Sequence, residues 1–97
     1  MVVAVVVCDL HLPQVHSLKE KRQVLHSIIG RLASQHRISI AETDFQDLHQ
    51  RGRLGMALVE RTAHRAEKRV QEIRDLIEAY PDLLITEWNC EFIEDIA

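Results

Sequence analysis

The chain has 97 residues, of which 46% are hydrophobic and 28% are charged, and its formal net charge is −3. This composition is typical of one globular domain spanning residues 1–97 and excludes a disordered chain. The negative charge excludes a general electrostatic attraction to nucleic acid or to an anionic membrane, so no DNA partner is expected and any RNA contact needs a local basic patch.

The first predicted element is a strand from Val2 to Leu12, which is rich in β-branched residues and is followed by Pro13. Its even positions are all apolar, whereas its odd positions change from apolar to polar at Asp9. This pattern indicates a central strand that is buried on one face throughout and on the other face for part of its length. The run has no basic segment before it and meets Asp9 early, so we expect neither a signal peptide nor a membrane span, and a cytoplasmic protein.

The next element is an amphipathic helix that begins after Ser17 and ends near Gln35. Ser17 and Glu20 form the S-x-x-E pattern of a capping box, which predicts the start of a helix. At helical spacing the chain then presents an apolar stripe of Leu18, Leu25, Ile28, Ile29 and Leu32.

Three more strands and one more helix complete the chain. Alternating apolar positions predict strands at Arg37 to Phe45, Arg53 to Glu60 and Leu83 to Ile93, the last with Leu84, Trp88, Cys90 and Phe92 on one face. Between the last two strands, a helical stripe of Ala66, Val70, Ile73 and Ile77 ends before Pro81. The order β-α-β-β-α-β predicts a ferredoxin-like α/β (α+β) sandwich, in which two helices cover one face of a four-stranded antiparallel sheet and the other face is open.

Lys21 lies where the first helix should present an apolar residue. At about 100° per residue it falls close to the centre of the stripe, and a lysine can lay its stem along apolar surface while its amine reaches an acid. The following strand ends at the same end of the sheet and carries Glu42 on its core face. We therefore expect a Lys21–Glu42 contact, either a structural ion pair that fixes the helix register or part of a binding site.

The same end of the sheet gathers a set of polar side chains that we name the charged end: Asp9, His11, Asp47, His49, Arg51 and Arg53. Their spacing matches no motif of metal ligands, of an activated nucleophile or of a phosphate-binding loop, so no catalytic residue, metal or cofactor is expected. Cys8 and Cys90 lie in apolar runs and are predicted to be buried, reduced thiols. The charged run HRAEKRVQEIRD is interpreted as the solvated face of the second helix.

The open face of the predicted sheet is apolar at one end. By alternation it carries Val3, Val5, Val7, Ala41, Gly55, Ala57, Val59 and Ile85. Exposed apolar patches of this kind commonly mark an interface, so we predict a homodimer through Val3, Val5, Val7, Ala57, Val59 and Ile85. The central strands offer no aromatic residues for base stacking, which argues against an RNA-recognition sheet.

Two motifs resemble those of one known family. SLKEKR at Ser17 to Arg22 and SIAETDFQDLHQRGRLGMALV at Ser39 to Val59 are similar to segments of the YlxP-like family of small bacterial proteins, domain of unknown function 503. The resemblance implies a ferredoxin-like fold and, because family members are often encoded beside genes for translation initiation and ribosome maturation, an accessory role linked to the ribosome. His49 stands where the family usually has tryptophan, and Gly52 where it usually has alanine.

The resemblance and the residues together predict a non-catalytic binding module linked to ribosome or RNA maturation. The alternative is a homodimeric module for protein interaction or small ligands with no RNA role. The predicted contact residues for RNA or another partner are Lys19, Lys21, Arg22, Asp47, Arg51 and Arg53.

Overall fold

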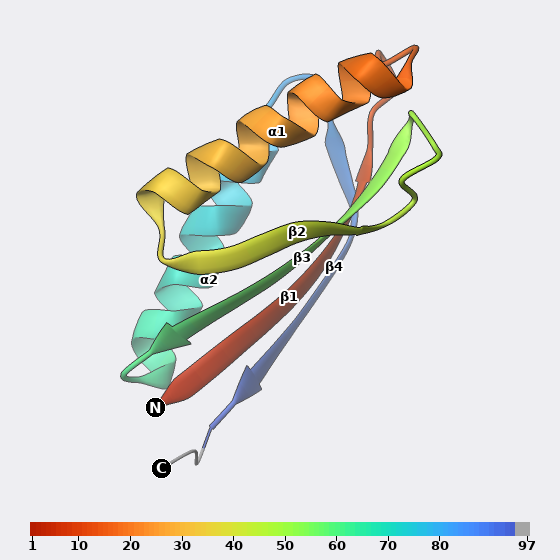
Figure 1. The fold of residues 1–97 in the computed structure, drawn as a ribbon. Coiled ribbons are helices and arrows are strands. Elements are labelled where there is room, and N and C mark those ends of the chain that lie inside the picture. Colours follow the sequence, from red (N-terminus) through yellow and green to blue (C-terminus); the bar gives the residue numbers. More distant parts are fainter. Residues whose placement is uncertain (95–97) are drawn as a thin grey trace.

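Six elements form the fold in the computed structural model, which describes residues 1–94 (Figure 1). In chain order they are β1 (Val2–His11), α1 (Leu18–Gln35), β2 (Ile38–Asp44), β3 (Arg51–Glu60), α2 (Ala63–Glu78) and β4 (Leu84–Ile93). The strands form one antiparallel sheet in the order β2-β3-β1-β4. Both helices lie on the same face of the sheet, so the predicted ferredoxin-like fold is confirmed.

The core lies between the helices and the even-numbered positions of the two central strands. In β1 every even residue from Val2 to Leu10 is buried, and β3 buries its own even positions in the same layer. The stripe predicted for α2 is buried in full, at Ala66, Val70, Ile73 and Ile77. Apolar residues recur at the strand repeat along β1 and β3 and at the helical repeat along α2. The apolar faces of these elements therefore meet in one layer.

Hydroxyl caps begin both helices. The Ser17 hydroxyl accepts a hydrogen bond from the Glu20 backbone N–H at 3.1 Å, and Thr62 accepts one from Arg65 at 3.2 Å. The Glu20 carboxylate reaches the backbone N–H of His16, at 3.2 Å, instead of that of Ser17, so the capping box is completed one residue earlier than expected. Neither helix in residues 1–94 has the length and apolarity needed to cross a membrane.

A β-bulge in the pairing of β1 with β4 changes which residues of β4 face the core. The register shifts between Asp9 and Leu10, so that Asp9 pairs with Glu87 while Leu10 pairs with Ile85. One extra residue reverses the side-chain alternation beyond it. Ile85 therefore packs against the core and Leu84 is 58% exposed, and the predicted positions of Ile85 on the open face and Leu84 in the core were both wrong.

Candidate functional site

Lys21 lies at the same end of the sheet and is more completely buried than any residue of the charged end. Its side chain is 2% exposed, and Nζ lies 2.8 Å from Glu42 Oε2. Nζ also donates hydrogen bonds to the carbonyl oxygens of Phe45 and Leu48, each at 2.6 Å. Glu42 Oε2 has no hydrogen-bond partner within residues 1–94, so its charge is met by the ammonium group alone.

The predicted Lys21–Glu42 contact is therefore confirmed. Two of the three ammonium donors of Lys21 bind carbonyl oxygens, and the Glu42 carboxylate lies beside the group as its counter-charge. The contacts fasten α1 to the connection between β2 and β3. They also bury Lys21, which favours the predicted structural role over the predicted role as a contact residue.

Arg53 is also held by internal contacts. Its Nε and Nη2 atoms bind the two carboxylate oxygens of Asp9 at 2.6 Å and 3.0 Å, and Nη1 lies 3.4 Å from Asp44 Oδ2. This bidentate hydrogen bond from Arg53 outweighs partial burial and holds the pKa of Asp9 below its ordinary value. The guanidinium groups of Arg51 and Arg53 lie 4.1 Å and 5.0 Å from the centre of the Phe45 ring.

The predicted contact set is thus split between the interior and the surface. Lys21 is buried and Arg53 is paired, whereas four members remain exposed: Lys19, Arg22, Asp47 and Arg51. A hollow of about 600 Å³ is lined by His11, Asp47, Leu48, His49, Gln50 and Arg51. Lys19 and Arg22 lie in a separate hollow on α1. No group of three or more His, Cys, Asp or Glu side chains suited to a metal occurs in the described part of the chain.

Neither cysteine is prepared to act as a nucleophile. Burial, with a smaller contribution from the neighbouring Asp9 charge, raises the pKa of the Cys8 thiol to about 12. Burial also raises the pKa of Cys90, which is only half-buried. Catalytic cysteines need a lowered thiol pKa, and the shift has the opposite direction at both residues.

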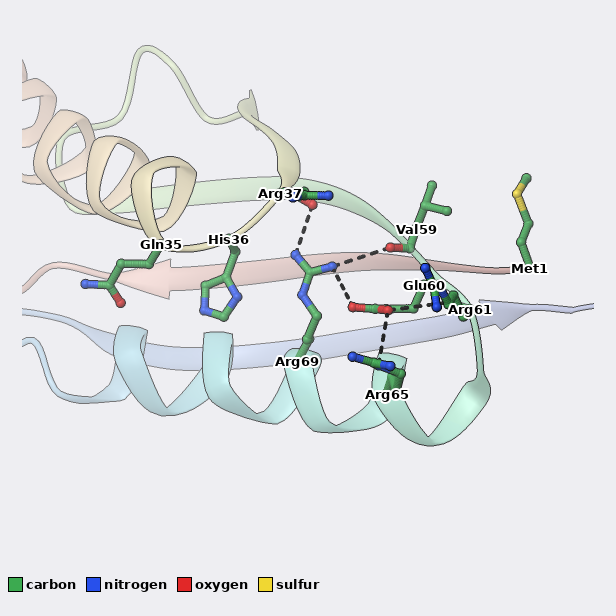
Figure 2. A pocket seen from close by; sticks show the side chains of 9 residues that line it. All are labelled: Met1, Gln35, His36, Arg37, Val59, Glu60, Arg61, Arg65 and Arg69. Atoms are coloured by element: carbon green, nitrogen blue, oxygen red, sulfur yellow. Dashed lines mark hydrogen bonds and ion pairs between the residues drawn. The ribbon is translucent and has the colours of Figure 1, made fainter.

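Sequence analysis missed a second polar site at the opposite end of the sheet, which we name the arginine pocket (Figure 2). It is a hollow of about 580 Å³ lined by Met1, Gln35, His36, Arg37, Val59, Glu60, Arg61, Arg65 and Arg69. These residues come from Met1 before β1, the end of α1 with the connection to β2, the end of β3 with the connection to α2, and the first turns of α2. The signal in the sequence is the spacing of Arg65 and Arg69, which places two arginines on one side of α2, with Arg61 just before its N-cap Thr62.

The comparisons with known proteins agree on one family. The sequence profile of a family described as "Protein of unknown function (DUF503)" matches residues 3–90. The chain belongs to the DUF503 family. The Bacillus subtilis (strain 168) "Uncharacterized protein YlxP" is 34% identical to this DUF503 protein over 85 residues, 84% of this chain and 92% of the relative. The predicted YlxP-like resemblance is thereby confirmed.

A solved structure supports the fold of this DUF503 protein. The crystal structure of At3g17210 from Arabidopsis thaliana matches it with a TM-score of 0.53, covering 98% of this chain and 96% of that chain. The two sequences are 11% identical, so the likeness concerns the fold alone.

Proposed function

We propose that this DUF503 protein is a non-catalytic binding module that works as a homodimer, with the open faces of two sheets packed together. The observation that carries the proposal is the apolar surface of the open face. Val3, Val5 and Val7 lie along β1, opposite Val59, Ala57 and Gly55 of β3. Val59 is 56% exposed, and such a contiguous aliphatic surface is stabilised by removal from water.

The size of the open face suits a second copy of the chain. Four strands of up to ten residues, at spacings of about 4.8 Å and rises of about 3.3 Å, cover roughly 600 Å². Stable interfaces begin at about 600 Å² for each partner. The face is flat and its β1 and β3 residues are small or β-branched, so two copies can approach closely.

Charge favours one arrangement of the two sheets. On the open face, β4 carries the exposed carboxylates of Glu87 and Glu91. A twofold axis perpendicular to the strands places these carboxylates over their own copies, which is repulsive. An axis along the strands instead places β4 over the partner's β2, and we propose that arrangement.

The mass in solution tests the dimer. Light scattering at micromolar concentration should give about 22 kDa, twice the 11.2 kDa of one chain. Val5→Arg places a charge at the centre of the open face and should give the monomer mass with an unchanged circular dichroism spectrum. Gln23→Arg adds the same charge on the exposed side of α1 and should remain dimeric. A monomeric parent protein excludes the proposal.

An accessory role in ribosome or RNA maturation is the second candidate. The observation that favours it is the exposure of Lys19, Arg22 and Arg51, which stay free to contact phosphates while Lys21 and Arg53 are held internally. Sedimentation of a cell lysate at low and moderate salt tests this role. Co-migration with a ribosomal subunit that salt weakens, and that Lys19→Ala/Arg22→Ala abolishes, supports it. Migration only at the top of the gradient at both salts favours a dimeric module for protein interaction or small ligands.

A further inference from the structure

We propose that the arginine pocket is a binding site for a phosphate group or a similar oxyanion. Four guanidinium groups and one carboxylate line it, so its formal charge is +3, four minus one. The whole chain carries −3. The pocket is therefore positively charged although the chain as a whole is negatively charged. An anionic ligand would reduce the electrostatic repulsion between the arginines.

Arg69 and Glu60 form the floor of the pocket. Arg69 is 17% exposed, and its Nη1 atom lies 3.1 Å from Glu60 Oε2. Its guanidinium group also donates hydrogen bonds to the backbone carbonyls of Arg37, at 3.0 Å, and Val59, at 3.4 Å. These contacts join α2 to the start of β2 and the end of β3 (Figure 2). Arg69 is a positioning residue, because both of its terminal nitrogens are held by contacts within the protein.

Glu60 remains ionised in this setting. Partial burial opposes ionisation, but a hydrogen bond from the Arg61 backbone N–H, the Arg69 contact and the nearby Arg65 charge hold its pKa below the ordinary value. Its carboxylate is therefore a fixed counter-charge for Arg69. The remaining positive charge belongs to the arginines at the rim.

Arg37, Arg61 and Arg65 form this rim. Arg65 is 62% exposed and its Nε atom is 3.8 Å from Glu60 Oε1, a weak contact that a ligand can replace. The side chains of Arg37 and Arg61 are exposed and make no hydrogen bond or ion pair with any other residue within positions 1–94. Three guanidinium forks from different segments line the same hollow, and arginine forks bind phosphate oxygens in a bidentate manner.

The place of the pocket in the fold adds to its preference for anions. α2 begins at Ala63, between Arg61 and Arg65 of the rim, so the positive end of its dipole lies close to these two residues. The hollow of about 580 Å³ can hold a phosphate together with a small organic group. The ligand is thus a phosphate group, supplied either by a small phosphorylated molecule or by a nucleic-acid backbone.

Calorimetry with inorganic pyrophosphate tests the site. We expect the parent protein to bind pyrophosphate with an affinity that falls as salt rises. Arg61→Ala/Arg65→Ala should weaken binding by roughly tenfold or more, because it removes two of the three rim forks. Arg31→Ala/Lys68→Ala removes the same charge from exposed positions outside the pocket and should bind within about twofold of the parent.

Two results overturn the proposal. One is no binding of pyrophosphate to the parent protein, and the other is equal weakening in both double variants, which indicates an effect of net charge alone.

A single-stranded RNA oligonucleotide without terminal phosphates distinguishes the source of the ligand. RNA that competes with pyrophosphate and loses affinity in Arg61→Ala/Arg65→Ala assigns the pocket to a nucleic-acid backbone. Pyrophosphate binding without competition assigns it to a small phosphorylated molecule. The test uses none of the residues proposed above to contact RNA.

Discussion

Replacing Lys21 with methionine isolates the most unusual interaction of the core. The substitution keeps an unbranched apolar stem on the helix stripe but removes the ammonium that binds two carbonyls and Glu42. Removing one partner of a buried ion pair typically costs about 3–5 kcal/mol, because the other charge stays buried without compensation. Glu42 is 23% exposed and can regain some water, so we expect about 3 kcal/mol, at the lower end.

Thermal and urea unfolding measure this loss. For a domain of this size each kcal/mol lowers Tm by about 4–8 °C, so Lys21→Met should melt about 12–24 °C below the parent. Lys19→Met makes the same chemical change at an exposed position and should stay within about 0.5 kcal/mol of the parent. Lys21→Met/Glu42→Leu should recover part of the loss, because no unpaired charge remains. A Lys21→Met protein that unfolds with the parent would falsify the structural role assigned to the pair.

Three further substitutions give separate expectations. Gly52→Ala should leave stability unchanged or raise it by about 0.4–1 kcal/mol, since a Cβ there meets only ordinary contacts, the nearest a leucine methyl at 3.6 Å. Gly55→Ala should cost about 1–3 kcal/mol in urea unfolding, because its Cβ would lie 2.7 Å from Thr43 Cγ2; equal stability of the two variants contradicts this. Pairing with Arg53 holds the pKa of Asp9 in the folded state below its ordinary value of 3.8. The Asp9–Arg53 pair therefore stabilises the fold fully above pH 3.8, and this stabilisation is lost as the pH falls through the folded-state pKa. Asp9→Asn should therefore destabilise at neutral pH, by a margin that shrinks at about pH 3.

The sequence alone could not show which residues of the charged end are exposed and which are paired within the protein. Lys21 and Glu42 were paired correctly because both lie on core-facing positions at the same end of the sheet, and the periods of helix and strand determine such positions. Arg53 was expected to be a contact residue, yet its fork binds Asp9 across the β1–β3 pairing. Whether Arg53 binds a ligand or a residue of the neighbouring strand depends on the pairing register of β1 and β3. A local sequence pattern does not contain this register.

The sequence by itself determined the order of elements, the buried stripe of α2, the buried centre of the α1 stripe at Leu25, Ile28 and Leu32, and the alternation of β1, because each follows from local hydrophobic periodicity. Only the tertiary structure decided the phase at Ile85, where the bulge opposite Asp9 and Leu10 reverses the alternation of β4. It also assembled the arginine pocket, since Arg37 and Arg69 lie 32 positions apart and meet only because the Arg69 side chain reaches from α2 to the α1–β2 connection. Periodicity reports which face of an element is apolar, whereas pairing register and the packing of elements bring distant charges together.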